Sequence, residues 1–171
     1  MLPGMLEAAA MLNQSYGCRS VVAGLRGVYD YESACGPFRQ NNVTVTYDDP
    51  RRTIFESDLV LTASGTATLE TGIIGRPMVV VYRTGMLTYM IARQLVKLDR
   101  IALVNLVLGD CVVPELIQGR ATPTNMAAAL DRFWPDEDYR VKVQTELQRV
   151  PTLLGGIGAS ERAAEAMAEY L

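Results

Sequence analysis

Apolar and polar positions follow two different periods along the chain. Short continuous apolar runs, as in residues 58–63 and 78–82, are typical of strands buried on both faces of a sheet. Between them, apolar residues recur at three- and four-residue spacing, which is typical of helices. The predicted strands are residues 20–25, 43–46, 58–63, 78–82 and 102–104. The predicted helices are residues 1–16, 28–35, 50–57, 66–74, 86–98, 123–134, 138–149 and 159–170, with a helical turn at 114–118.

The alternation of short strands with helices predicts right-handed βαβ units and a parallel sheet covered on both faces. About five strands indicate an α/β fold with a Rossmann-like doubly wound sheet. We assign residues 1–150 to this domain and residues 151–171 to a C-terminal helical extension. The first helix begins without a leading strand, which is unusual for a complete domain of this class.

Composition excludes several kinds of chemistry. The 171 residues contain 16 basic and 19 acidic side chains, no histidine and three cysteines. Without histidine, a Ser-His-Asp triad, a Cys-His pair and a His-containing zinc site are excluded within this chain. Cys18, Cys35 and Cys111 lack C-x-x-C spacing, so we expect no disulfide framework and no metal site. The mild acidity argues against nucleic-acid binding.

The chain shows no sign of membrane insertion. No apolar run approaches the ~18–20 residues of a membrane span. The N-terminus also lacks a basic segment followed by an apolar run, so no signal peptide is expected. We therefore expect a soluble, cytoplasmic protein.

The strongest candidate for a binding site is the turn Ser64, Gly65, Thr66, which follows the predicted strand at 58–63. In open α/β sheets, ligands bind beyond the carboxyl ends of the strands. Small residues at the start of the next helix leave backbone N–H groups free for a phosphate, and the helix dipole favours the same anion. Glu70, one turn further, is placed to accept the two hydroxyls of a ribose. The alternative is an ordinary βα turn in which Glu70 only complements the helix dipole.

Weaker candidates follow the next predicted elements. Arg83 follows the strand at 78–82, where a guanidinium is able to bind a phosphate through two hydrogen bonds. Asn105 follows the predicted strand at 102–104 and is a candidate for binding a base or a sugar. Glu115 and Gln118 lie on the following turn. The alternatives are an exposed arginine at a strand end and an Asx turn at Asn105.

A basic stripe lies on the predicted helix at 86–98 and just beyond it. Arg93, Lys97 and Arg100 share one helical face at i, i+4 and i+7 spacing. Such a stripe is able to bind a membrane surface or anionic lipid. A solvated helix face is the alternative.

Taken together, the motifs resemble lipid-A-disaccharide synthases, which are bacterial glycosyltransferases of the GT-B fold. The resemblance rests on SDLVLTASGTATLE (57–70), GRPMVVVYR (75–83), LTY (87–89), VNL (104–106), VPELIQ (113–118) and ATPTN (121–125), in the family's order. Two positions depart from the family pattern. Val104 stands where proline is usual, and Met90 where an aromatic residue is frequent.

The resemblance implies a reaction and a site. A UDP-activated diacylglucosamine donates its sugar to diacylglucosamine 1-phosphate with inversion, and no cofactor or metal is expected. Ser64, Gly65 and Thr66 would face the diphosphate and Glu70 the ribose. Arg83, Asn105 and Gln118 would line the same cleft. The basic stripe would fit lipid substrates, with the enzyme peripheral at the inner face of the inner membrane.

The resemblance covers only the family's C-terminal, UDP-sugar-binding half. The catalytic residues would lie in an N-terminal domain that this sequence lacks, so we expect weak UDP binding and no sugar transfer by the chain alone. The last helix, at 159–170, would cross to that domain or to a partner chain, and its apolar stripe is able to drive a homodimer.

Two alternatives remain open. One is another GT-B UDP-sugar enzyme, of the peptidoglycan N-acetylglucosaminyltransferase or epimerase type. Those enzymes usually carry a Gly-Gly-rich phosphate loop, whereas this chain has Ala63-Ser64-Gly65. The other is a non-catalytic truncated domain.

Overall fold

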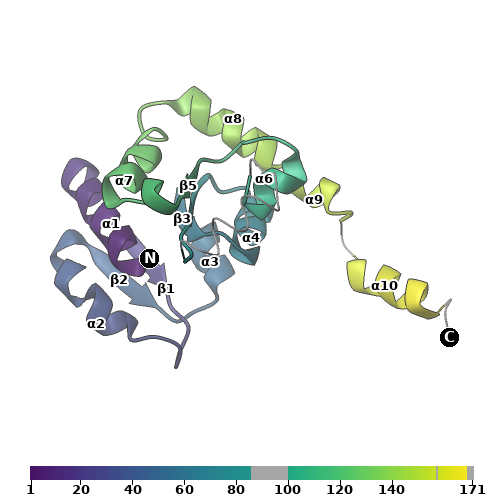
Figure 1. The fold of residues 1–171 in the computed structure, drawn as a ribbon, viewed down its shortest axis with the longest axis horizontal. Coiled ribbons are helices and arrows are strands. Elements are labelled where there is room, and N and C mark those ends of the chain that lie inside the picture. Colours follow the sequence, from purple (N-terminus) through teal and green to yellow (C-terminus); the bar gives the residue numbers. More distant parts are fainter. Residues whose placement is uncertain (86–99, 157, 169–171) are drawn as a thin grey trace.

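The computed structural model describes residues 1–85, 100–156 and 158–168 (Figure 1). Its strands are β1 (Ser20–Ala23), β2 (Val43–Thr46), β3 (Val60–Ala63), β4 (Met78–Tyr82) and β5 (Glu115–Ile117). All pairings among these strands are parallel: β1 pairs with β2, and β4 lies between β3 and β5. The predicted α/β class with parallel, Rossmann-like strands is confirmed.

Helices connect and cover these strands. They are α1 (Leu2–Tyr16), α2 (Tyr31–Cys35), α3 (Pro50–Phe55), α4 (Thr66–Ile74), α6 (Leu103–Leu108), α7 (Pro123–Asp131), α8 (Glu137–Leu147), α9 (Val150–Leu153) and α10 (Ala159–Ala168), with 3-10 turns η1 (Gly36–Asn41) and η2 (Gln118–Arg120). The predicted start of α7 is confirmed, since the Thr122 side chain accepts a hydrogen bond from Asn125 N. The helix predicted over residues 28–35 begins only at Tyr31, because Asp30 caps it by accepting from Ser33 N. The helix predicted over residues 86–98 lies outside the described residues.

Two predicted elements are wrong in kind. Residues 102–104, predicted as a strand, form the N-cap and first turn of α6. The helical turn predicted at 114–118 is instead β5 followed by η2, and Val80 N donates to Pro114 O at 2.9 Å. The apolar run over residues 101–108 suits a buried strand and a short buried helix equally, so periodicity alone could not separate the two.

The main core surrounds β4. Met78, Val79, Val80 and Val81 are each at most 2% exposed, and Phe133 and Leu147 are completely buried in the same cluster. Close packing extends to α4, where a Cβ placed on Gly72 would lie 2.8 Å from a Val104 methyl group of α6. These contacts fix β4 and its neighbours relative to the helices that follow them.

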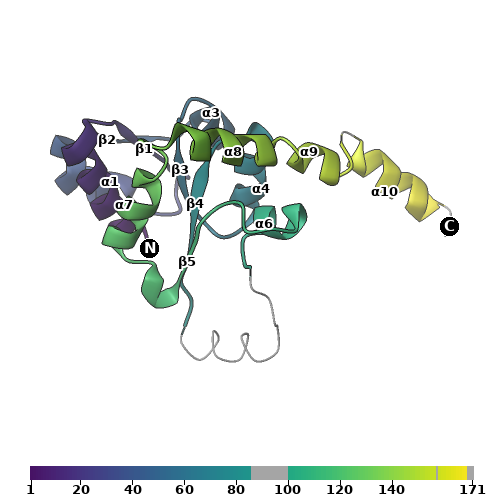
Figure 2. The ribbon, with the colours of Figure 1, turned by 90° about the horizontal axis from the view of Figure 1, so that it is seen from above.

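A second, smaller core lies beneath β1 and β2. It contains Leu6 of α1, Cys35 of α2 and Val43 of β2. Helix α1 belongs to both cores, since its Ala8 and Leu12 pack in the main cluster. The single sheet expected from the sequence is therefore two sheets joined mainly by helices. In Figure 2 the strands lie in the order β2, β1, β3, β4 across the molecule.

The C-terminal helix α10 projects away from the rest of the chain in Figures 1 and 2. Its described side chains, from Ser160 to Ala168, are all exposed. No helix among the described residues is long and apolar enough to cross a bilayer.

Candidate functional site

The turn at the end of β3 is held by two neighbouring segments. Ser64 N donates to Val81 O of β4 at 2.9 Å, which extends the ladder between the two strands by one residue. The Ser64 hydroxyl donates to Ile101 O at 3.2 Å. Ser64 thus fixes the turn against the residues that precede α6, and its hydroxyl proton is already engaged.

The N-terminus of α4 is open. Gly65 is its N-cap and has no side chain that could satisfy the first N–H groups. Thr68 donates to Gly65 O through its backbone N–H at 3.1 Å and through its hydroxyl at 2.8 Å. Thr66 and Ala67 are the first residues of the helix, whose N–H groups have no intrahelical acceptor. A Cβ placed on Gly65 would meet no atom of the described residues within 4 Å, so the space directly around this N-cap is open among them.

Glu70 lies one turn into α4, on the face that also carries Thr66. One oxygen of its carboxylate is 3.6 Å from Nε of Arg51, and the two side chains are 41% and 69% exposed. Arg51 is the second residue of α3, and Asp49 caps that helix by accepting from Arg51 N at 3.0 Å. Sequence reasoning missed Arg51. Its position shortly after a strand was the available signal, as it was for Arg83.

Gln118 joins the ends of β4 and β5. Its side-chain oxygen accepts from Thr84 N at 3.0 Å, and its side-chain nitrogen donates to Thr84 O at 3.2 Å. Its φ of 52° lies in the left-handed region, which turns the chain sharply after β5. Arg83, next to Thr84, is exposed and forms no ion pair with any described residue. Gln118 therefore holds the segment that carries Arg83.

Asn105 is completely buried, and its amide is fully engaged within the chain. Its oxygen accepts from Val112 N and Val113 N at 3.0 Å each. Its nitrogen donates to Val113 O at 2.9 Å and to Glu115 Oε1 at 2.7 Å. These bonds give Asn105 a structural role and leave no free group for a ligand. The sequence placed it at the end of a strand, whereas it lies within α6.

Glu115 completes this buried network. Its carboxylate accepts from Ile101 N at 2.8 Å and from Ala102 N at 3.2 Å. It thereby caps the N-terminus of α6 from a neighbouring strand, and a charged acceptor at this position also complements the helix dipole. The Ser64 hydroxyl donates to Ile101 O. By fixing residues 101–102, the network therefore also supports the turn at Ser64 indirectly.

The remaining candidates are not brought into this arrangement. Arg93 and Lys97 of the basic stripe lie outside the described residues, and Arg100 is half-buried. The described residues contain no group of three or more side chains suited to hold a metal. Burial raises the pKa of the thiols of Cys18, Cys35 and Cys111, so all three are protonated at neutral pH.

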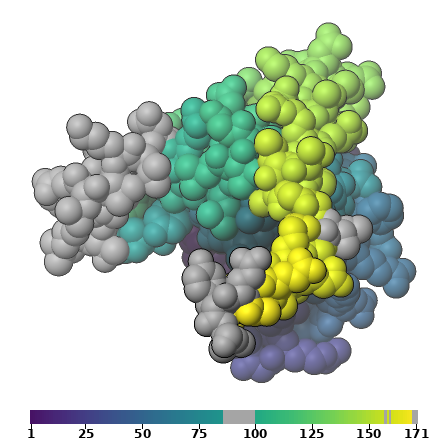
Figure 3. All heavy atoms as spheres, turned by 90° about the vertical axis from the view of Figure 1, so that its right-hand side faces the viewer, coloured from purple at the N-terminus to yellow at the C-terminus, as the bar shows by residue number. Residues whose placement is uncertain are grey.

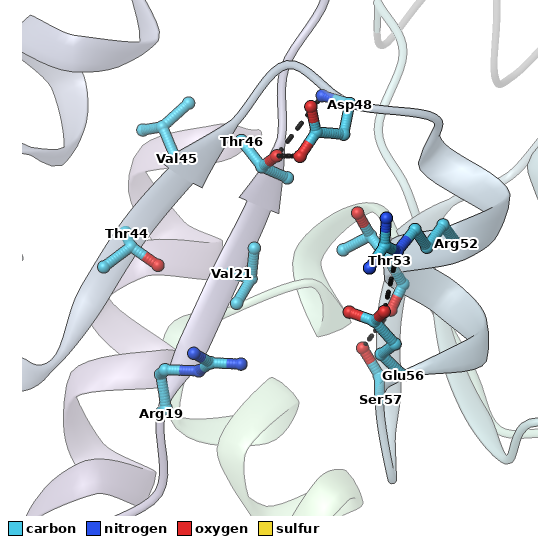
Figure 4. A pocket seen from close by; sticks show the side chains of 10 residues that line it. All are labelled: Arg19, Val21, Thr44, Val45, Thr46, Asp48, Arg52, Thr53, Glu56 and Ser57. Carbon is cyan, nitrogen blue, oxygen red and sulfur yellow. Dashed lines mark hydrogen bonds and ion pairs between the residues drawn. The ribbon is translucent and has the colours of Figure 1, made fainter.

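Two cavities lie away from the turn. One, of 280 Å³, lies between the β1–β2 sheet and α3 (Figure 4). The other, of 320 Å³, is lined by Asp58, Arg76, Trp134 and their neighbours. Neither of these two cavities includes residues 64–70, which lie at the carboxyl edge of β3, β4 and β5.

Comparisons with known proteins give a consistent family. The family model described as lipid-A-disaccharide synthetase matches residues 7–169. A lipid-A-disaccharide synthase of Myxococcus xanthus is 38% identical over the whole chain and 45% of its own length. One of Anaeromyxobacter dehalogenans is 38% identical over 96% of the chain and 44% of its length. One of Syntrophus aciditrophicus is 44% identical over 70% of the chain and 30% of its length. The chain spans less than half the length of these relatives.

Replacing Asn105 with leucine is expected to destabilise the chain by about 3 kcal/mol. The change removes the acceptor of the Val112 and Val113 N–H groups, and each unsatisfied buried group costs about 1–3 kcal/mol. The measurement is urea unfolding followed by circular dichroism. As a control, Gln14→Ala changes an exposed amide on α1 and is expected to stay within about 0.5 kcal/mol of the unchanged chain. Equal stability of the two variants would contradict the structural role of Asn105.

Proposed function

Because the chain belongs to the lipid-A-disaccharide synthetase family, we propose that it is the UDP-binding half of a glycosyltransferase. In the longer protein, a diacylglucosamine would pass from UDP to diacylglucosamine 1-phosphate. The observation that carries the proposal is the open N-terminus of α4 at the carboxyl edge of β3, with Arg83 after the neighbouring strand β4. The lipid acceptor, a membrane surface and a place at the inner face of the inner membrane belong to the same proposal.

The diphosphate would bind at the turn formed by Ser64, Gly65 and Thr66. The free N–H groups of the first turn of α4 and the positive end of its dipole favour an anion there. The exposed hydroxyl of Thr66 adds a donor, while Ser64 keeps the turn in place through Ile101. Arg83 would supply a full positive charge and two parallel hydrogen bonds to phosphate oxygens. These groups hold the diphosphate without a metal ion.

The ribose would bind at Glu70. A carboxylate has two oxygens and accepts hydrogen bonds from two neighbouring hydroxyls at once. The Glu70–Arg51 pair is long and exposed, so it restrains the carboxylate without sequestering it. Arg51 thereby orients Glu70, and its charge adds to the positive potential at this edge of the sheet.

Sugar transfer also needs an acceptor site and a general base beside the bound nucleotide. The groups at the carboxyl edge of the sheet would bind and orient the nucleotide, and the proposal assigns the general base to another part of the longer protein. The relatives are more than twice as long as the part that this chain matches, which leaves room for a second domain. The acceptor site and the base would lie there.

The chain alone is expected to form no disaccharide from UDP-diacylglucosamine and diacylglucosamine 1-phosphate. The measurement is product analysis by mass spectrometry after prolonged incubation with purified chain in detergent. A full-length relative in the same assay serves as the positive control. Disaccharide formed by the purified 171-residue chain would contradict the division of the site between two halves.

Replacing Glu70 with alanine is expected to weaken UDP binding about tenfold or more, because hydrogen bonds to a charged group contribute about 1.5–3 kcal/mol. Stability without ligand should fall by less than about 1 kcal/mol, since only an exposed ion pair is lost. The measurement is thermal unfolding across a UDP titration, in which ~100-fold excess over the Kd stabilises the chain by ~2.7 kcal/mol.

The matched control for this experiment is Glu56→Ala. Glu56 is also an exposed carboxylate paired with an arginine, Arg52, but it lies at the far end of α3. Its removal should leave the UDP affinity unchanged. If both variants bind UDP as the unchanged chain does, Glu70 does not contact the ribose. A chain that shows no UDP response at millimolar concentrations would count against nucleotide binding as a whole.

Helix α10 would make the contact with the other half or with a second copy. α10 projects away from the body of the chain in Figures 1 and 2 and lies in front of it in Figure 3, where this end faces the viewer. Ala163, Ala166 and Met167 share one face of this exposed helix, and Met167 is 70% exposed. With no other half present, this stripe would pair with a second copy of the chain.

Sedimentation of the chain alone is expected to show a dimer at tens of micromolar concentration. Met167→Glu places a charge in the apolar stripe and should weaken association about tenfold or more. Met11→Glu changes a methionine on α1 that is 39% exposed, and it should leave association unaffected. If the unchanged chain is monomeric throughout, the stripe does not drive a homodimer.

A further inference from the structure

The amino edge of the β3–β4–β5 sheet carries a cavity that the nucleotide site does not use. It has a volume of 320 Å³ and lies where residues 58–59 lead into β3 and Arg76 leads into β4. Trp134, which follows α7, and Arg140 and Gln144 of α8 also line it. Small-molecule pockets have volumes of about 300–1,000 Å³, so this cavity has room for a small organic ligand.

The cavity lies at the opposite end of the strands from the turn at Ser64. Ser64 follows Asp58 by six positions. A parallel strand rises about 3.3 Å per residue, so the two places are about 20 Å apart along β3. A ligand at the amino edge would therefore be a second ligand, and it would not compete with a nucleotide at the carboxyl edge.

Arg76 is held in place by contacts that leave most of its donors available. Its Nη2 donates to Phe55 O, and its guanidinium lies 5.5 Å from the centroid of the Phe55 ring. A guanidinium has five N–H donors, and Arg76 forms no ion pair with any described residue. Phe55 therefore positions a positive charge at the cavity without neutralising it.

Arg140 supplies a second guanidinium from α8. Its Nη2 is 3.5 Å from Oε1 of Glu137 on the same helix, and the two side chains are 36% and 79% exposed. Such an exposed contact contributes little to stability, so Arg140 is able to exchange it for a stronger anion. Two guanidinium groups that line one cavity favour an anion with more than one charge, because it bridges them and offsets their mutual repulsion.

Asp58 and Gln144 add polar groups that have no partner in the described part of the chain. Asp58 forms neither a hydrogen bond nor an ion pair there, although Arg76 and Arg140 line the same cavity. The side chain of Gln144 forms no hydrogen bond there either. A carboxylate accepts hydrogen bonds, and a carboxamide both donates and accepts. These two side chains are therefore suited to hydroxyl groups of a ligand.

Trp134 gives the cavity an apolar surface. Tyr16 of α1 stacks on one face of the indole, with the ring centroids 4.8 Å apart and the rings inclined by 10°. The Tyr16 hydroxyl donates to the carboxylate of Asp131, which fixes the tyrosine in turn. The indole is thus half-buried and held in one orientation. Together with Leu59 it offers an apolar contact to the carbon skeleton of a ligand.

We propose that this cavity binds a small phosphomonoester that carries hydroxyl groups, such as a phosphorylated polyol or sugar. Arg76 and Arg140 bind the phosphate, whose charge of about −1.5 to −2 at pH 7 matches two guanidinium groups. Asp58 and Gln144 bind the hydroxyl groups, and Trp134 packs against the carbon skeleton. None of these residues belongs to the turn at Ser64, so this site is independent of UDP binding.

The test uses Trp134, which is the only tryptophan among the 171 residues. Its fluorescence and the NMR signal of its indole N–H are followed while the chain is titrated with glycerol 3-phosphate at constant ionic strength. Inorganic phosphate and glycerol are titrated in parallel. We expect a saturable change with glycerol 3-phosphate, a Kd about fivefold or more higher for inorganic phosphate, and no change with glycerol, which lacks the anion.

Two results of these titrations would overturn the proposal. One is the absence of a saturable change in both signals at millimolar glycerol 3-phosphate. The other is an equal Kd for glycerol 3-phosphate and inorganic phosphate, which would mean that the hydroxyl groups are not recognised. None of these readouts uses a nucleotide, so their outcome is separate from that of the UDP titration.

Arg140→Gln removes one guanidinium and is expected to raise the Kd for glycerol 3-phosphate about tenfold or more, because hydrogen bonds to charged groups are strong. Lys142→Gln is the matched control. It removes the same charge from an exposed position of α8 that does not line the cavity, and the Kd should stay within about twofold. Equal effects of the two variants would overturn the proposal, since only the overall charge would then matter.

Asp58→Ala tests the part of the site that binds hydroxyl groups. It removes an acceptor and a negative charge, so the Kd for inorganic phosphate should stay the same or fall. The Kd for glycerol 3-phosphate should rise to within about twofold of that value. Unchanged preference for glycerol 3-phosphate would contradict the role of Asp58. Circular dichroism checks that each variant is folded, and Arg140→Lys, which keeps the charge but loses the paired donors, replaces Arg140→Gln if that variant is unfolded.

Discussion

The parallel ladder on β4 is the constraint on which the candidate site depends. Because β3 and β5 both pair in parallel with β4, the residues that follow these strands lie at the same carboxyl edge of the sheet. The ladder continues one residue past β3, to Ser64 N and Val81 O, and it sets the start of α4. The burial of Met78 to Val81 makes β4 rigid, so the turn at Gly65 and the exposed Arg83 are carried on a fixed support.

A buried polar network stabilises the same edge from behind. Glu115 caps α6, Asn105 bonds to Glu115 and to the backbone of residues 112–113, and Ile101 accepts the hydroxyl of Ser64. Such a network is costly to leave incomplete, because each unpaired buried group loses its hydration without compensation. Asn105 and Glu115, which were candidates for ligand contact in the sequence, thus form their hydrogen bonds within the chain, next to the segment that holds the turn.

The sequence predicted those elements whose signals are local. Residues 66–74 and 78–82 form α4 and β4 with the expected bounds, since glycine ends the helix and the strand is a continuous apolar run. The errors at 102–104 and 114–118 have a different origin. There the Ala102 N–H at the start of α6 is bound by the Glu115 carboxylate, thirteen residues away on a strand that pairs only through tertiary contacts. The position of Ser64, Gly65 and Thr66 after a strand was predictable because its signal is local. The hydrogen bonds of Asn105 and Gln118 were not predictable, because they depend on tertiary contacts.

The order of the described strands and the place of the candidate site are connected. In a doubly wound sheet the ligand binds where the strand order reverses, between the strands from which the two halves wind in opposite directions. Here β1 and β2 wind one way and β3, β4 and β5 the other, so that point falls between β1 and β3. The turn after β3 lies beside this point, so the proposed diphosphate site is where the topology of a doubly wound sheet favours a ligand.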